Sequence, residues 1–241
     1  MKQRKAETIL RDPGRYAHHD RIFLNNPVIM QGMGLAPLVV LATSGRNALM
    51  LAAAVALLLT PSRVVSYLLS KLVPLQEHAG EEELRAKLLP RGLLYSGTAA
   101  VLYMAVYPVL DRLFGVELLT LGIYLPILVV EPLLIYRYGR VQETLRKAVS
   151  KGLRVTVGYA AVLLLVGCIR EWLATGAVFG IPLTANTALM PLASMPAGGF
   201  ILLGVISAVW RALAARYRAF LTNEARSQVI VNQQKEARGK P

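Results

Sequence analysis

The acidic residue that is best placed to take part in chemistry lies inside an apolar stretch of this sequence. Glu131 stands within the apolar block 118–136, whereas Asp111 and Glu171 lie at the ends of such blocks. A carboxylate inside a membrane is costly to bury, so it is by default a candidate for handling an ion or a proton. The alternative for Glu131 is a packing role, in which the carboxylate pairs with a basic group such as Arg63.

Thiols and imidazoles, the other side chains that could bind a metal, are scarce. The sequence contains one cysteine, within the fifth apolar block, and three histidines outside the blocks: Cys168, His18, His19 and His78. A single cysteine excludes an intrachain disulfide and a multi-cysteine metal site within this chain. We therefore predict no metal site in this chain, and we interpret Cys168 as a small packing residue.

The elements that would position Glu131 are long apolar helices. Hydrophobic residues make up 55% of the 241, charged residues 17%, and the mean hydropathy is +0.48. The apolar residues arrive in blocks near the ~20 residues that cross a bilayer as helix. The blocks are 23–43, 48–72, 93–110, 118–136, 153–173 and 197–215. The sequence therefore predicts an all-α polytopic membrane protein with six transmembrane helices.

The pattern also predicts how the chain is divided. A basic tail, residues 1–22, precedes a six-helix membrane domain, residues 23–221, and residues 222–241 read as a polar, disordered tail. The uncharged stretch 176–196 is expected to fold back onto the external face of the bundle.

The basic residues predict the orientation. A net charge of +13 could indicate nucleic-acid binding, but 24 of the 27 Lys and Arg fall in the amino-terminal tail, the second and fourth loops and the carboxy-terminal segment. The first, third and fifth loops hold one each: Arg46, Arg112 and Arg170. By the positive-inside rule both termini are cytoplasmic. We therefore predict that the chain lies in a lipid bilayer and does not bind nucleic acid.

Two of the predicted spans contain residues that interrupt helices. Gly34 and Pro37 stand in the first span, and Pro126 stands in the fourth. Each of these spans opens a half of three helices, about 23–113 and 116–221, and an odd number of crossings inverts the second half. Inverted repeats with broken helices at matching places surround functional centres near the middle of the membrane. The alternative is that Gly and Pro serve close helix packing.

Five short motifs, in this order, resemble one known family. They are Asn25-Asn26-Pro27-Val28, Gly34-Leu35-Ala36-Pro37, Tyr124-Leu125-Pro126-Ile127-Leu128-Val129-Val130, Ile169-Arg170-Glu171 and Pro196-Ala197-Gly198-Gly199-Phe200. Together they resemble the six-helix membrane subunits of Rnf and Nqr complexes (RnfA/RnfE and NqrD/NqrE), with the cytoplasmic amino terminus of the RnfE/NqrD branch. The resemblance implies a bacterial plasma membrane location and a paralogous six-helix partner subunit. It also implies a two-iron two-sulfur cluster held between the two subunits by cysteines of the broken spans.

This sequence departs from the family at the cluster ligands. Where the family has Gly-Leu-Cys-Pro and Val-Val-Asn-Cys, the cysteine positions are occupied by Ala36 and Pro132. Neither a methyl group nor a proline ring can bind iron. We therefore expect the cluster to be absent, and we predict no cofactor and no catalytic residue in this chain. We interpret Arg170-Glu171 as a structural pair near the external boundary.

Two functions remain open at this point. The first is a non-catalytic membrane subunit of an Rnf/Nqr-like ion-translocating electron transport complex, acting as partner or scaffold. The alternative is a small stand-alone transporter that reuses the inverted repeat. Its ion or substrate path would run past the residues at the broken spans: Glu131, Gly34, Pro37 and Pro126.

Overall fold

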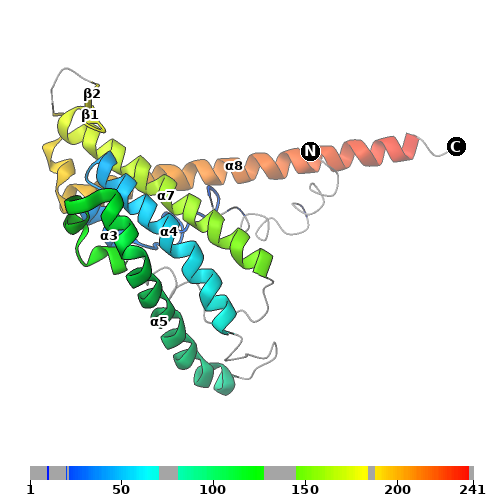
Figure 1. The fold of residues 1–241 in the computed structure, drawn as a ribbon. Helices are drawn as coiled ribbons and strands as arrows, with labels where there is room; N and C mark the ends of the chain where they lie inside the picture. Colours follow the sequence, from blue (N-terminus) through cyan, green and yellow to red (C-terminus); the bar gives the residue numbers. More distant parts are fainter. Residues whose placement is uncertain are drawn as a thin grey trace.

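The computed structural model is mostly helical: α4, α5 and α7 run in a similar direction, and α8 extends away from them (Figure 1). It describes residues 10, 20, 22–70, 81–127, 145–183 and 188–238. Its long helices are α4 (Gly45–Ser70), α5 (Glu81–Phe114), α7 (Leu145–Thr175) and α8 (Pro196–Arg238). Shorter elements are α3 (Leu35–Leu41), the 3-10 helices η1 (Gly115–Leu121) and η2 (Pro191–Ser194), and the strands β1 (Ala177–Val178) and β2 (Ile181–Pro182).

Four stretches are long and apolar enough to cross a membrane: 45–69 in α4, 92–121 in α5 with the following η1, 149–175 in α7 and 196–231 in α8. These lengths reach or exceed the ~20 residues needed for ~30 Å of hydrocarbon. The described part of the structure is thus mostly helical and contains four candidate spans, which agrees with the prediction of a helical membrane protein. The full set of six spans, and the inverted repeat, remain predictions.

The first apolar block is not a continuous helix. Residues 22–34 form successive turns, and only the seven residues of α3 are helical. Gly32 and Gly34 have positive φ angles of 69° and 66°, which ends any regular helix before α3 begins. The predicted interruption of this block at Gly34 is therefore present.

The fourth apolar block is described only over its first part. Gly122 adopts a positive φ of 46° after η1, and residues 124–127 begin a helical turn that includes Pro126. Glu131 and Pro132 lie outside the described residues.

The core lies between α4 and α7. Buried apolar side chains of both helices pack together with those of α3 and η1; they include Leu51, Leu58, Val162, Val166, Leu38 and Leu121. Helix α8 contacts η2 and α3 near its start and then diverges from the bundle, as Figure 1 shows. The candidate functional site therefore lies around α3, which is held between α7 and the start of α8.

The carboxy-terminal segment differs from the expectation of disorder. Helix α8 continues to Arg238, so residues 222–238 are helical. The first part of this extension is buried on one side, because Ala225 is fully buried where Val229 and Leu10 pack against it. Composition indicated a polar tail, but it does not reveal such a contact with a residue near the other end of the chain.

Candidate functional site

The turns that precede α3 are fixed by one buried amide side chain. Asn26 is fully buried, and its Nδ2 donates to the carbonyl oxygens of Ile22 and Gly158, both at 2.9 Å. Its Oδ1 accepts from the backbone N–H groups of Val28 at 2.9 Å and Ile29 at 3.3 Å. All four hydrogen-bonding positions of the amide are therefore used. Asn26 joins this irregular segment to α7 without leaving a polar group unsatisfied.

The start of α3 packs directly on an aromatic residue of α7. The Tyr159 hydroxyl donates to the Gly34 carbonyl oxygen at 3.1 Å, and Tyr159 is almost completely buried. A Cβ on Gly34 would overlap the Tyr159 hydroxyl and ring. Gly34 therefore satisfies two requirements at once, a left-handed backbone and a close approach to α7. Tyr159 stands near the middle of the candidate span 149–175, so α3 begins near the middle of that span.

The other end of α3 is held by a buried guanidinium. Arg170 is fully buried, and its Nη1 donates to the carbonyl oxygens of Val39 at 2.6 Å, Ala42 at 3.2 Å and Leu38 at 3.4 Å. These carbonyls lie at the carboxy-terminal end of α3, which has no further turn to satisfy them. A cation at this end also interacts favourably with the helix dipole.

The same guanidinium binds the connection between α7 and α8. Its Nε donates to the Ala193 carbonyl oxygen at 2.8 Å, and Nη2 donates to those of Ser194 and Met195, both at 3.2 Å. Arg170 therefore contacts six carbonyl oxygens, which uses all five of its N–H groups. Its charge is balanced by carbonyl dipoles, since the described residues include no ion pair for it.

Glu171 accepts hydrogen bonds from backbone N–H groups, including one at a helix amino terminus. Its Oε2 accepts from the Gly45 N–H at 2.7 Å and the Phe179 N–H at 3.0 Å, and its Oε1 accepts from the Gly180 N–H at 2.8 Å. The carboxylate thus caps the start of α4 and the turn of the β1–β2 hairpin. The sequence indicated a structural role for Arg170 and Glu171 as a pair. The two side chains are structural, but each binds backbone groups of a different element instead of the other.

Of the predicted path residues that the structure describes, Gly34 and Pro37 belong to the start of this half-helix, and Pro126 stands in the helical turn 124–127. Gly34 and Pro37 are buried, Pro126 is partly buried, and Ala36 is exposed in the first turn of α3. Glu131 and Pro132 fall outside the described residues, so their position relative to α3 stays a prediction. Sequence reasoning missed Tyr159, because an aromatic residue in an apolar helix gives no signal of what it contacts.

The residues at the family's ligand positions do not fit an iron-sulfur cluster. Position 36 presents an exposed methyl group, which offers no donor to iron. Cys168 follows Tyr159 by nine residues on α7, which places it ~14 Å along the helix from the level at which α3 begins. Among the described residues there is no group of three or more His, Cys, Asp or Glu that could hold a metal.

Long apolar helices, and an interrupted segment held by buried polar side chains, define a helical integral membrane protein with a half-helix between its spans. A family model described as "Rnf-Nqr subunit, membrane protein" matches residues 17–207. The chain belongs to this family, which confirms the resemblance found in the sequence.

Named relatives agree with the family. The chain is 31% identical over 160 residues to the E subunit of the ion-translocating oxidoreductase complex of Aliivibrio fischeri (strain MJ11), which covers 64% of this chain and 63% of that relative. It is 29% identical over 217 residues to the protein of the same name from Shewanella oneidensis, covering 82% and 86% of the two chains. The namesake from Thioalkalivibrio sulfidiphilus is 27% identical over 208 residues, covering 80% and 86%.

Proposed function

We infer that this chain is a membrane subunit of an Rnf-type ion-translocating electron transport complex. Membership of the family and the names of the relatives support this inference. The half-helix α3, which Asn26, Tyr159 and Arg170 hold near mid-span, supports it as well, because the resemblance implies an interrupted first span. In this reading the chain acts as partner or scaffold for a paralogous six-helix subunit. It carries no cluster of its own, because an alanine and a proline stand where the family has cysteines.

The test is purification of the full chain from its native host in mild detergent. We expect a second six-helix membrane subunit and further subunits of the complex to co-purify. Recovery of this chain free of any other membrane subunit, from membranes that contain them, would refute assembly.

A second experiment tests the absence of the cluster. Co-expressed with its paralogue alone, this chain should give no stoichiometric iron or acid-labile sulfide and no visible bands of a two-iron two-sulfur centre. The matched variant is Ala36→Cys with Pro132→Cys, which should recover iron only if the paralogue supplies two thiolates. Iron at full stoichiometry in the wild-type pair would show that other ligands hold a cluster.

We further infer a bacterial plasma membrane location with both termini cytoplasmic, supported by the 24 to 3 division of Lys and Arg between alternate loops. Reporter fusions after Arg146 and Glu224 should be cytoplasmic, and a fusion after Gly115 should be external. A cytoplasmic signal from the Gly115 fusion would contradict this orientation.

The alternative function, a stand-alone transporter, depends on Glu131 within the fourth apolar block. Glu131→Gln keeps the shape and hydrogen bonding of the side chain but removes its titratable charge. If Glu131 handles an ion or a proton, this variant should lose ion transport while its abundance stays at the wild-type level. If Glu131 only packs, Glu131→Gln should be nearly silent and Glu131→Ala should lower abundance. Transport per assembled protein in the native host decides between the two roles.

A further inference from the structure

The connection between α7 and α8 exposes apolar side chains where a water-facing loop would carry charge. Residues 172–210 contain no Asp, Glu, Lys, Arg or His. Within the connection, six large apolar side chains expose between 44% and 65% of their surface: Phe179, Ile181, Leu183, Leu189, Leu192 and Met195. Contiguous exposed apolar surface of this kind marks contact with a membrane or another protein.

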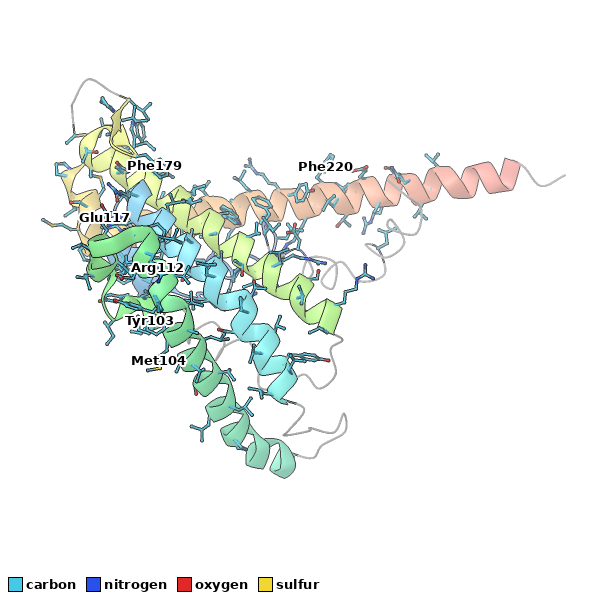
Figure 2. The ribbon with its side chains drawn as sticks, in the orientation of Figure 1. Tyr103, Met104, Arg112, Glu117, Phe179 and Phe220 are labelled. Carbon is cyan, nitrogen blue, oxygen red and sulfur yellow. The ribbon has the colours of Figure 1, made fainter. Side chains whose placement is uncertain are left out.

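Hydrogen bonds fix the height of this connection along the axes of the bundle helices. Glu171 binds the Phe179 and Gly180 N–H groups and also the Gly45 N–H, so the hairpin turn lies at the level where α4 starts. The next residue of α4, Arg46, forms an exposed ion pair with Glu117 at 2.7 Å. Figure 2 shows Phe179 and Glu117 at the same end of the helices. Charged side chains at this level place it outside the hydrocarbon core of a bilayer.

Helix lengths place the hairpin just beyond the hydrocarbon. From Lys151 to Glu171, whose carboxylate holds the hairpin turn, α7 rises about 30 Å at 1.5 Å per residue, which matches a hydrocarbon thickness of ~30 Å. The hairpin follows Thr175 after Gly176, and its two-residue strands extend about 7 Å. The headgroup layer on each side of the hydrocarbon is about 5–8 Å thick. The hairpin therefore fits within that layer.

We propose that the β1–β2 hairpin and η2 form a lipid-binding surface that lies in the headgroup region of one leaflet. The occupant is lipid because the exposed apolar surface continues without a charged residue onto the exposed side chains of α8, which begin with Phe200, Ile201 and Val205. A protein partner would be expected to meet a polar rim, which protein interfaces carry. Trp172, partly exposed at the same end of α7, is of the residue type enriched at membrane boundaries. This surface would hold the carbonyls of η2 in place around Arg170, independently of whether the chain assembles with other subunits.

The test places a fluorescent probe on the hairpin. In a Cys168→Ala background, Phe179→Cys and, as a second site, Ile181→Cys are labelled with an environment-sensitive fluorophore in the full chain. The labelled chain is reconstituted in vesicles of phosphatidylcholine and phosphatidylglycerol, alone and as the co-purified assembly. Iodide on both sides of the membrane reports water, and phosphatidylcholine with a nitroxide on its headgroup reports lipid. Ser227→Cys, on the extension of α8 well past one membrane thickness from Pro196, is the control site.

Both hairpin probes should show blue-shifted emission, strong quenching by the lipid nitroxide and weak quenching by iodide, alone and in the assembly. The Ser227→Cys probe should show the reverse preference. Iodide quenching at the hairpin equal to that at the control would mean that the hairpin faces water. Protection from both quenchers in the assembly would mean that a protein covers it. Either of these two results overturns the proposal.

Discussion

Replacing Arg170 by alanine should remove most of the folded protein from the membrane. The substitution removes a donor from six carbonyl oxygens around α3 and η2, of which those of Leu38, Val39, Ala42 and Ala193 lie in buried hydrogen bonds. The Met195 carbonyl would keep the Gly199 N–H as a donor. Each buried acceptor left unsatisfied costs roughly 1–3 kcal/mol. Even a few such losses equal the ~5–15 kcal/mol that stabilises a typical domain. We therefore expect a several-fold loss of abundance and a large fall in the melting temperature of the detergent-solubilised protein.

Two variants make this result specific to the guanidinium. Arg170→Lys keeps the charge but offers three donors in place of five, so it should also destabilise, though less than alanine. Arg46→Ala removes an arginine at the same end of the bundle, whose ion pair with Glu117 is exposed. An exposed pair contributes about 0–1 kcal/mol, so this control should stay near wild type. Wild-type abundance and melting of Arg170→Ala would show that water or lipid satisfies the carbonyls.

The importance of Arg170 could not be derived from its sequence position. A basic residue next to an acidic one near the end of an apolar block indicates a boundary pair, and that reading gives each residue the other as its partner. The observed partners come from α3 and η2, which are about 130 and 25 residues away along the chain. Such contacts depend on the tertiary arrangement and leave no local pattern.

The interrupted first block, by contrast, could be predicted from residue types. Gly and Pro restrict or free the backbone locally, so Gly34 and Pro37 mark a break whatever surrounds them. What surrounds them requires the structure. Tyr159 of α7 binds the start of the half-helix and so fixes its depth, and Arg170 of α7 binds its carboxy-terminal end. In the same way, apolar blocks predicted long helices, whereas the contact of Leu10 with the α8 extension had no signal.

Gly34→Ala should be among the most destabilising single-methyl changes in this chain. The residue has a φ of +66°, and the new Cβ would overlap the hydroxyl and ring of Tyr159, which is buried and cannot move aside freely. A positive φ alone costs a non-glycine residue roughly 1–2 kcal/mol. Overpacking a buried contact typically adds about 1–3 kcal/mol. We expect a marked fall in melting temperature and abundance, together with loss of the packing that holds α3 against α7.

Gly115→Ala separates the two contributions. Gly115 has a similar φ of +56°, and nothing lies within 4 Å of a Cβ built there. This variant should show only the conformational cost, so the difference in melting temperature between the two variants measures the clash with Tyr159. The double variant Gly34→Ala with Tyr159→Ala removes the overlap and should be more stable than the sum of its two single changes predicts. Equal melting temperatures for Gly34→Ala and Gly115→Ala would mean that α3 is free to move away from α7, and the half-helix would then not be fixed at mid-span.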